Sequence, residues 1–299
     1  MPAAKPLEGF LGLPEERQDP TTARVFVLPI PYEATVSFES GTRDGPRAII
    51  DASRQVELYD EELEAEPALR WGIHTLPALP CDLPAGEQML ERIARAVEPV
   101  VKDGKFLLAL GGEHGISPGI VRGVRRALPG RLTVVQIDAH ADLRDTYEGE
   151  RFSHACAMRR ILDENPGETV QLGIRSFSRE EADFIRANRG RVNVLTAARI
   201  AETDRGDFLR ELAGLVEGRS VYLTLDVDGL DPAVVPATGT PEPGGLSWRE
   251  ALDILKTIAE ASRIVAMDCV ELAPRPGLHM AEFAVAKLLY KSLAYAIRA

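Results

Sequence analysis

Short apolar runs alternate with longer amphipathic stretches along most of this chain. The apolar runs predict buried strands at Arg24–Ile30, Phe106–Leu110, Leu132–Ile137, Val170–Ile174, Val192–Leu195, Val221–Leu225 and Ile264–Val270. Apolar residues at helical spacing predict helices at Arg47–Leu58, Glu87–Lys102, Pro118–Leu128, Arg179–Asn188, Asp207–Val216, Trp248–Glu260 and Met280–Arg298. Strands and helices that alternate in this way predict an α/β fold, with a mostly parallel sheet covered by helices on both faces.

The first 22 residues lack this periodicity. They carry Pro, Gly and charged residues, and we expect them to form an N-terminal arm on the surface or on a neighbouring subunit. Residues 23–299 show no internal repeat, low-complexity tract or change of composition. We therefore expect one catalytic domain over 23–299, a size that single α/β domains commonly reach.

Composition narrows the classes of partner. The 299 residues are 45% hydrophobic and 27% charged, with a formal net charge of −11. This acidity argues against nucleic acid or an anionic membrane surface as a partner, and it suits a small cationic substrate. No run of about 18 apolar residues is present to span a bilayer.

Three widely spaced cysteines, Cys81, Cys156 and Cys269, provide neither a disulfide framework nor a CxxC metal site. The N-terminus lacks the basic region and apolar core of a signal peptide. We therefore expect a protein of the reducing cytoplasm.

The apolar run Leu132–Ile137 ends in three residues of metal-ligand type, Asp138, His140 and Asp142. Residues two apart on a strand project to the same side, so these side chains converge if the extended conformation continues past Ile137. Two carboxylates and an imidazole brought together need a countercharge, which a divalent cation commonly provides.

Other strand ends carry similar residues, and ligands of open parallel sheets bind at that edge. His114 follows Phe106–Leu110, Asp226 and Asp228 follow Val221–Leu225, and Glu271 follows Ile264–Val270. For Asp231, before Pro232, we expect only the structural role of a helix N-cap.

The expected ligand set contains four carboxylates and two imidazoles: His114, Asp138, His140, Asp142, Asp226 and Asp228. Six ligands suit a pair of ions about 3.5–4 Å apart, which activates water for hydrolysis. A set rich in oxygen and free of thiolate favours Mn²⁺, although Fe, Co or Ni also fit. The alternative, a buried salt-bridge network, leaves four carboxylates facing only two imidazoles, and burial of unpaired like charges is costly.

Longer motifs around these residues resemble the arginase/agmatinase (ureohydrolase) family. They are Gly111-Gly112-Glu113-His114, Asp138-Ala139-His140-Ala141-Asp142, the run from Asp226 to Gly245, the segment from Pro31 to Pro46, the segment from Ser153 to Arg160, and Glu271-Leu272-Ala273-Pro274. They occur in the family's order from about residue 24 to the C-terminus. The Pro31–Pro46 and Ser153–Arg160 segments are more similar to agmatinases than to arginases.

The resemblance implies a three-layer αβα sandwich with two Mn²⁺ per subunit. His114 and Asp142 would bind one ion, His140 and Asp228 would bind the other, and Asp138 and Asp226 would bridge.

The resemblance also implies catalytic and substrate-binding residues. His154 would shuttle protons beside the substrate, and Glu271 would bind the guanidinium. Independently of the resemblance, Asp142 can accept the proton of the attacking water, because it is a terminal ligand. The expected reaction is the hydrolysis of agmatine to putrescine and urea by a homo-oligomer, a trimer or a hexamer.

Some positions depart from the family's pattern. Glu113 and Gly115 stand where Gly-Gly-Asp-His-Ser is commoner, and Gly277 stands where an Asp commonly follows the Glu271 motif. Ser176 stands where arginases usually carry an acid that reads the α-amino group, so arginine is disfavoured as the substrate.

Several alternatives remain open from the sequence. Guanidinobutyrate, guanidinopropionate and aminopropylagmatine share the expected chemistry. A single-zinc deacetylase shares the architecture but needs no second site. A non-catalytic relative need not keep all of these residues. A dinucleotide enzyme is excluded, because Gly-Gly-Glu-His is not a GxGxxG turn.

Overall fold

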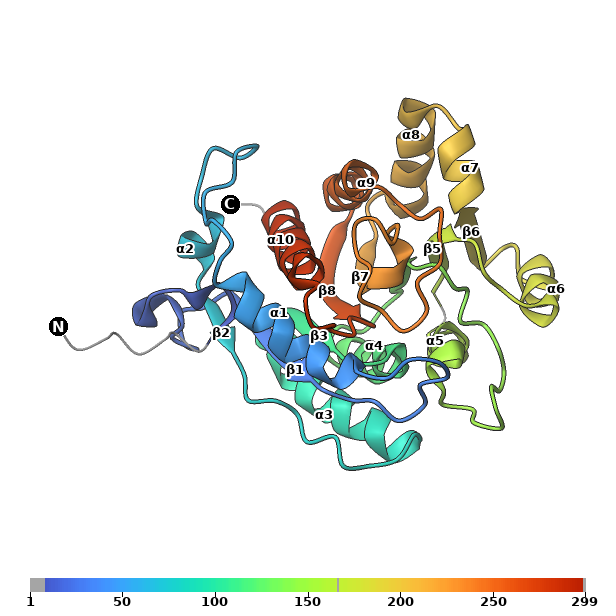
Figure 1. Ribbon diagram of the computed structural model, residues 1–299, viewed down its shortest axis with the longest axis horizontal. Coiled ribbons are helices and arrows are strands. Elements are labelled where there is room, and N and C mark those ends of the chain that lie inside the picture. The colour runs from blue at the N-terminus through green and yellow to red at the C-terminus, as the bar shows by residue number, and fades with distance from the viewer. Residues whose placement is uncertain (1–8, 166, 298–299) are drawn as a thin grey trace.

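The computed structural model describes residues 9–165 and 167–297. Eight parallel strands form one sheet in the order β2-β1-β3-β8-β7-β4-β5-β6 (Figure 1). Their bounds are β1 Val25–Ile30, β2 Ile73–Thr75, β3 Phe106–Gly111, β4 Thr133–Ile137, β5 Thr169–Ile174, β6 Val192–Thr196, β7 Ser220–Asp226 and β8 Arg263–Val270. The expected parallel sheet is confirmed, and every strand pairing in the described chain is parallel.

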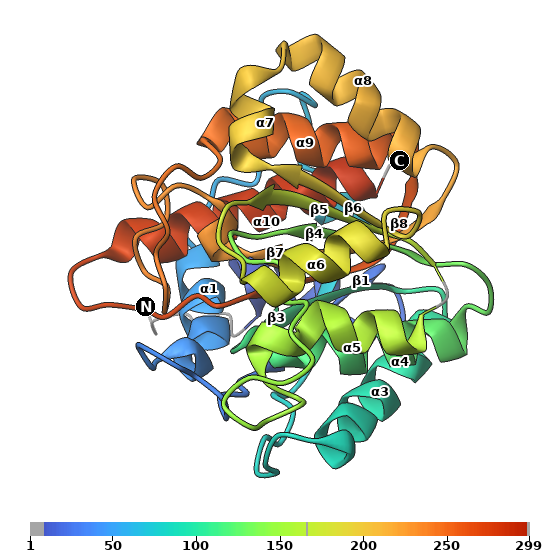
Figure 2. The same ribbon diagram turned by 90° about the vertical axis from the view of Figure 1, so that its right-hand side faces the viewer.

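Helices cover both faces of the sheet, which confirms the three-layer αβα architecture (Figure 2). One layer contains α1 Gly45–Ser53, α2 Pro67–Trp71, α7 Ala197–Glu202, α8 Arg205–Val216, α9 Trp248–Ala261 and α10 His279–Ala296. The other layer contains α3 Glu87–Lys102, α4 Ser117–Ala127, α5 Ala157–Glu164 and α6 Arg179–Ala187.

Burial on both faces explains why the strands are continuous apolar runs. Leu108 and Leu110 of β3 belong to the core that they share with α1 and α10, whereas Leu107 and Ala109 belong to the core that they share with α3 and α4. Successive side chains of a strand alternate between faces, so a strand covered on both sides needs apolar residues at every position.

The order of the strands places distant parts of the chain side by side. After β3 the chain leaves space for two strands before β4, and the last two strands, β8 and β7, fill it. As a result, β3, β8, β7 and β4 are consecutive neighbours, and their carboxyl ends meet at one edge of the sheet. All the expected metal ligands and Glu271 follow these four strands.

The sequence-based expectations missed the short elements. β2, α2, α5 and α7 were not predicted, and α1 spans Gly45–Ser53 in place of the expected Arg47–Leu58. Three to eight residues are too few to display a clear hydrophobic period, so these elements depend on packing against longer neighbours. The longer helices, such as α3, agree with prediction to within a few residues.

The described part of the expected arm, residues 9–22, packs on its own chain. Phe10, Leu11 and Leu13 are buried in the same core as α1 and β1. The division into an arm and a domain at residue 22 stays a prediction. Among the residues that the structure describes, no helix combines the length and the apolar character needed to cross a membrane.

Candidate metal centre

A cavity of 290 Å³ opens at the edge of the sheet where these four strands end. Six of the residues singled out from the sequence line it: His140, Asp142, His154, Asp226, Asp228 and Glu271. The remaining two, His114 and Asp138, are buried and contact Asp142 and His140 of this set, respectively. The structure thus brings all eight predicted site residues to one place.

The first candidate ion position lies around His114. Its Nδ1 atom is 3.0 Å from Asp138 Oδ2, 3.0 Å from Asp142 Oδ2 and 3.4 Å from Asp226 Oδ2. The same Nδ1 is buried without a hydrogen bond of normal geometry. A nitrogen that faces several carboxylate oxygens without bonding to one of them is arranged as in a ligand shell around a shared centre.

The second candidate position lies around His140. Its Nδ1 atom is 3.0 Å from Asp228 Oδ2 and 3.6 Å from Asp138 Oδ1. Ligand atoms of His114, Asp138 and Asp142 form one compact group, and those of Asp138, His140 and Asp228 form another. Asp138 belongs to both groups, which suits a bridging ligand, whereas Asp226 contacts the ligand set on the His114 side.

Charge balance tests whether cations fit this site. Burial, together with the Asp138 charge, raises the pKa of Asp142 to about 6, and burial raises the pKa of Asp226 well above its usual range. Although burial opposes protonation of His140, the Asp138 and Asp228 carboxylates raise its pKa to about 12. Protons are therefore held where negative charge is in excess. Nitrogen and oxygen donors without thiolate fit divalent cations that would take over this role.

Hydrogen bonds orient the imidazole of His114. Its Nε2 lies 2.9 Å from Thr224 Oγ1 on β7, which leaves Nδ1 to face the carboxylates. Behind this contact, Ser117 Oγ donates to the buried Asp268 Oδ2 at 2.6 Å, and the Tyr222 hydroxyl donates to the same oxygen. A second ring nitrogen engaged in this way fixes the tautomer of a metal-binding histidine.

The carboxylates are oriented by backbone and amide donors. The Nε2 amide of Gln136 donates to Asp138 Oδ2 at 2.6 Å, and the backbone N–H of His140 donates to Asp138 Oδ1 at 2.5 Å. Asp228 Oδ1 accepts from the backbone N–H of Ala139 at 3.0 Å. The ligands are therefore held before any ion binds.

The backbone after Ile137 does not stay extended, as the convergence of Asp138, His140 and Asp142 had been expected to require. β4 ends at Ile137, and Asp142 has a φ of 51°. Glu271 also has a positive φ, 65°, and these two are among only five such non-glycine residues in the described chain. This conformation costs roughly 1–2 kcal/mol per residue, so tight packing of the strand ends, and not strand alternation, brings the ligands together.

Glu271 and His154 flank the ligands. Glu271 Oε1 accepts from the backbone N–H of His114 at 2.6 Å, and burial raises the pKa of Glu271 well above its usual range. Burial, assisted by the charge of His114, lowers the pKa of His154 to about 4, so its ring is neutral near pH 7. His154 Nδ1 lies 3.2 Å from Thr35 Oγ1, in a loop that sequence reasoning had not assigned to the site.

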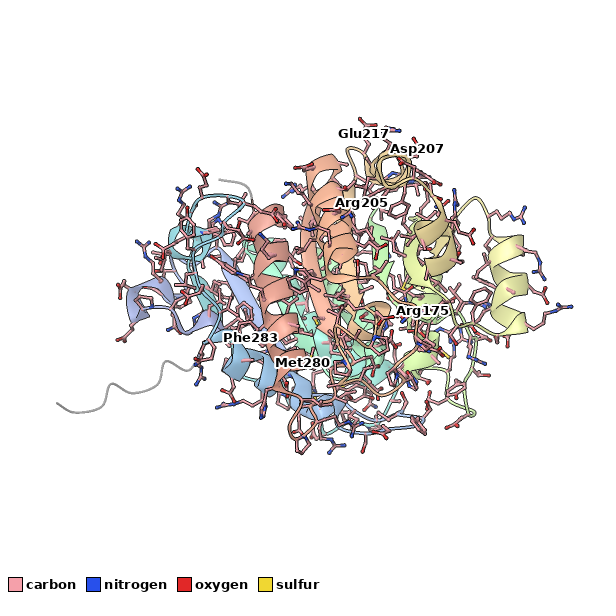
Figure 3. All side chains as sticks on the ribbon, turned by 45° about the horizontal axis from the view of Figure 1, so that its top comes forward. Arg175, Arg205, Asp207, Glu217, Met280 and Phe283 are labelled. Carbon is pink, nitrogen blue, oxygen red and sulfur yellow. The ribbon has the colours of Figure 1, made fainter. Side chains whose placement is uncertain are left out.

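Arg175 is a second residue that sequence reasoning missed. It directly follows β5 (Figure 3), and its guanidinium donates to carbonyl oxygens of the loop after β7, including Asp228 at 2.7 Å and Glu242 at 2.6 Å. Asp231 braces the same loop by accepting from the backbone N–H groups of Ala233, Gly244 and Gly245. Asp231 is therefore a loop brace and not the helix N-cap that we expected.

The parallel αβα sandwich carries these candidate metal ligands at the carboxyl edge of its sheet, an arrangement that suits a hydrolase. The profile of the Arginase family matches residues 23–294, and the chain belongs to this family.

Two relatives by sequence and one solved structure show which members of the family this chain is similar to. The chain is 42% identical over 282 residues to an N(1)-aminopropylagmatine ureohydrolase of Synechocystis sp., covering 91% of this chain and 89% of that protein. It is 35% identical over 256 residues to an agmatinase of Bacillus anthracis, covering 84% of each. The crystal structure of agmatine ureohydrolase of Thermoplasma volcanium superposes with a TM-score of 0.84 at 30% identity, covering 97% of this chain and 94% of that one.

Proposed function

We propose that this hydrolase cleaves an aliphatic guanidine with a cationic tail to urea and an amine, with agmatine as the first choice of substrate and putrescine as its product. The observation that carries the proposal is the pair of candidate ligand groups that share the buried Asp138, with Asp142, His140 and Asp228 lining the cavity. Membership of the arginase family supports the same reaction class.

The proposed cofactor is two Mn²⁺ ions. His114 and Asp142 would hold one and His140 and Asp228 the other, with Asp138 and Asp226 between them. Two such ions, when bound, lower the pKa of a shared water and so supply a nucleophile at neutral pH. The excess of oxygen donors supports Mn²⁺ over softer metals.

The chain's own residues bind the substrate and move protons. Glu271, buried at the cavity wall, would grip the planar guanidinium through paired hydrogen bonds. Asp142 Oδ2 faces His114, which leaves Oδ1 to accept the proton of the attacking water. His154, which lines the same cavity, would deliver a proton to the leaving amine as its C–N bond breaks.

The charges farther out in the cavity support a cationic tail over a carboxylate. Glu39 and Glu181 line the cavity, and Arg144 is the sole arginine or lysine among the described lining residues. The Arg144 guanidinium lies 5.0 Å above the Tyr147 ring, and its Nε is 3.7 Å from Glu181 Oε2. Arg144 is thus paired with Glu181, as Arg275 is with Glu39, and the described lining offers a substrate carboxylate no arginine or lysine that lacks an acidic partner.

N(1)-aminopropylagmatine is a second substrate that a specific observation favours. Phe38 and Phe177 line the cavity, yet they are 74% and 43% exposed. Exposed aromatic rings at a rim suit the extra methylenes and the extra ammonium of a longer polyamine tail. The relative of Synechocystis sp. that carries this activity in its name supports the same choice.

The proposal includes action in the cytosol as a homo-oligomer, a trimer or a hexamer. All three cysteines are free, which suits a reducing compartment. Exposed Met280 and Phe283 on α10 (Figure 3) suit burial against another subunit.

A panel of guanidines tests the reaction. Urea release is measured for agmatine, N(1)-aminopropylagmatine, arginine, guanidinobutyrate and guanidinopropionate with the Mn²⁺-loaded enzyme. We expect kcat/KM for at least one of the first two to exceed that for the three carboxylates by about 100-fold, because Arg144 is already engaged. A preference for a carboxylate substrate, or no urea from any of the five, overturns the proposal.

An acetylated polyamine serves as the control for the deacetylase alternative. Release of acetate from this compound, together with no urea from the five guanidines, would assign the site to amide hydrolysis.

A further inference from the structure

A buried carboxylate outside the ligand set is bonded to a loop far away in the sequence. Glu113 Oε2 accepts from the backbone N–H groups of Ala34 and Thr35, both at 2.7 Å. Glu113 Oε1 accepts from the Thr35 hydroxyl at 2.9 Å. Three donors from one loop thus converge on one side chain, although Thr35 and Glu113 are 78 residues apart.

The Thr35 hydroxyl connects this carboxylate to His154. Thr35 Oγ1 accepts from the backbone N–H of His154 at 3.0 Å and lies 3.2 Å from His154 Nδ1. A hydroxyl has one proton and two lone pairs. Since its proton is donated to Glu113, the hydroxyl has only a lone pair to offer to Nδ1. The Ser153 hydroxyl is farther from Nδ1, at 3.4 Å, so the shorter contact with Thr35 favours the tautomer with hydrogen on Nδ1.

From this geometry we propose that Glu113 and Thr35 are positioning residues, which hold His154 in the tautomer with hydrogen on Nδ1 and a lone pair on Nε2. The inference rests on the proposed function, because the tautomer matters only if His154 carries protons. Within the described chain, no hydrogen bond engages Nε2, and His154 lines the cavity. Nε2 is therefore the atom that picks up a proton and passes it to the leaving amine.

Two departures from the commoner family motif belong to this arrangement. A Cβ atom on Gly115 would lie 3.0 Å from Glu113 Oε1 and 3.4 Å from the carbonyl oxygen of Phe152. Glu113 is one methylene longer than the commoner Asp, and its carboxylate uses the space that a side chain at 115 would restrict. Glu113 and Gly115 thus form one structural unit.

The variant Glu113→Gln tests the direction of the hydrogen bonds between residue 113, Thr35 and His154, because Gln has almost the same shape as Glu. The Gln oxygen must accept from the two backbone N–H groups, so its NH₂ group faces Thr35 Oγ1 and donates to it. The Thr35 hydroxyl then donates to Nδ1 and moves the hydrogen to Nε2. A purely structural role for Glu113 predicts near wild-type turnover, because every hydrogen bond is kept.

Thr35→Val and Thr35→Ser form a matched pair, since Val removes the hydroxyl and Ser keeps it. We expect kcat for urea release to fall about tenfold or more in Glu113→Gln and in Thr35→Val, because positioned proton transfer contributes about 10²–10⁴-fold to rate. KM and metal content stay as in the wild type, and Thr35→Ser stays within about threefold in kcat. If the Glu113→Gln variant loses metal, the comparison of Thr35→Val with Thr35→Ser still tests whether the Thr35 hydroxyl positions His154.

Neutron diffraction of the deuterated, metal-loaded enzyme provides the direct measurement. We expect deuterium on His154 Nδ1 in the wild type and on Nε2 in Glu113→Gln. Deuterium on Nε2 of the wild type, or full turnover of Thr35→Val at full metal content, overturns the inference. If the wild type releases no urea from any guanidine while deuterium lies on Nδ1, the proposed function fails and the positioning by Thr35 stands.

Discussion

Two charged clusters of this molecule, each built around buried side chains, differ in how their charges are balanced. The first, the strand-end cluster, comprises the six candidate metal ligands, in which four carboxylates face two imidazoles. The second, the Lys291 cluster, comprises Lys291 of α10 and three acids of the 60–62 loop: Lys291 Nζ lies 3.0 Å from Asp60 Oδ2 and 3.4 Å from Glu61 and Glu62.

The Lys291 cluster is balanced by its own surroundings. Arg249 and Lys256 also approach Glu62, at 3.5 and 3.7 Å, so three basic side chains meet three acidic ones. Asp60 Oδ1 accepts from the backbone N–H groups of Glu62 and Leu63. Among the described residues, no lysine or arginine side chain forms an ion pair with the strand-end cluster, so its four carboxylates face only two imidazoles. A charged cluster that is complete indicates a structural role, whereas one that lacks cations indicates a binding site.

The largest expected effect comes from the shared ligand. Asp138→Asn removes a charge that both ion positions use, so kcat/KM should fall by about 10³-fold or more and metal content should fall as well. Elemental analysis and urea release measure the two effects. The matched control is Asp60→Asn, which should keep its metal. Full turnover by a metal-free Asp138→Asn protein would refute the role of the strand-end cluster.

Lys291→Met should affect stability and not chemistry. Lys291 is 1% exposed, and its removal leaves Asp60 buried without its cation. Loss of one partner of a buried ion pair costs about 3–5 kcal/mol, so urea denaturation of the metal-loaded enzyme should show a loss of this size. The control Lys256→Met, at an exposed position beside Glu62, should cost less than about 1 kcal/mol. Equal losses of stability in Lys291→Met and Lys256→Met would contradict the structural role of the buried Lys291.

Glu271→Gln separates substrate binding from metal binding. The Gln Oε1 atom still accepts from the His114 N–H, so the ligands should stay in place. The charge that pairs with the guanidinium is lost, and kcat/KM should fall by about 100-fold, or about 2.7 kcal/mol. Unchanged kinetics at full metal content would remove Glu271 from the substrate site.

The smallest expected effect is the release of protons from the strand-end cluster when metal binds. This release measures the protons that the cluster holds in the absence of metal. Although burial opposes their charge, the neighbouring carboxylates raise the pKa of His114 well above its usual range and that of His140 to about 12. His140 is thus protonated in the metal-free protein at pH 7. It must lose this proton to bind metal, so apparent affinity should rise with pH.

Calorimetric titration in buffers of different ionisation enthalpy counts these protons. We expect at least one proton, that of His140, to be released per chain when Mn²⁺ binds at pH 7. Metal uptake without proton release would contradict the assigned charge states.

Most residues of the candidate site could be predicted from the sequence, because the candidate ligands directly follow clear apolar runs. Leu132–Ile137 and Val221–Leu225 are unambiguous apolar runs, and the residues after a parallel strand reach the edge of the sheet where ligands bind. Thr35 and Arg175 were missed because their partners lie far away in sequence: the Arg175 guanidinium bonds to carbonyl oxygens more than 50 residues away. The loop segment near Thr35 offered only a family resemblance and no local pattern.

The sequence by itself determined the seven longer strands, most of the longer helices and the types of side chain at the strand ends, because hydrophobic period is a local property of the chain. Only the tertiary structure decided that β8 and β7 lie between β3 and β4, and hence that Glu271 bonds to the backbone of His114. It also decided which ligands surround His114, which surround His140, and that Thr35 bonds to both Glu113 and His154. These contacts join segments that are distant in the chain, so they depend on the packing of the whole sheet and not on any local pattern.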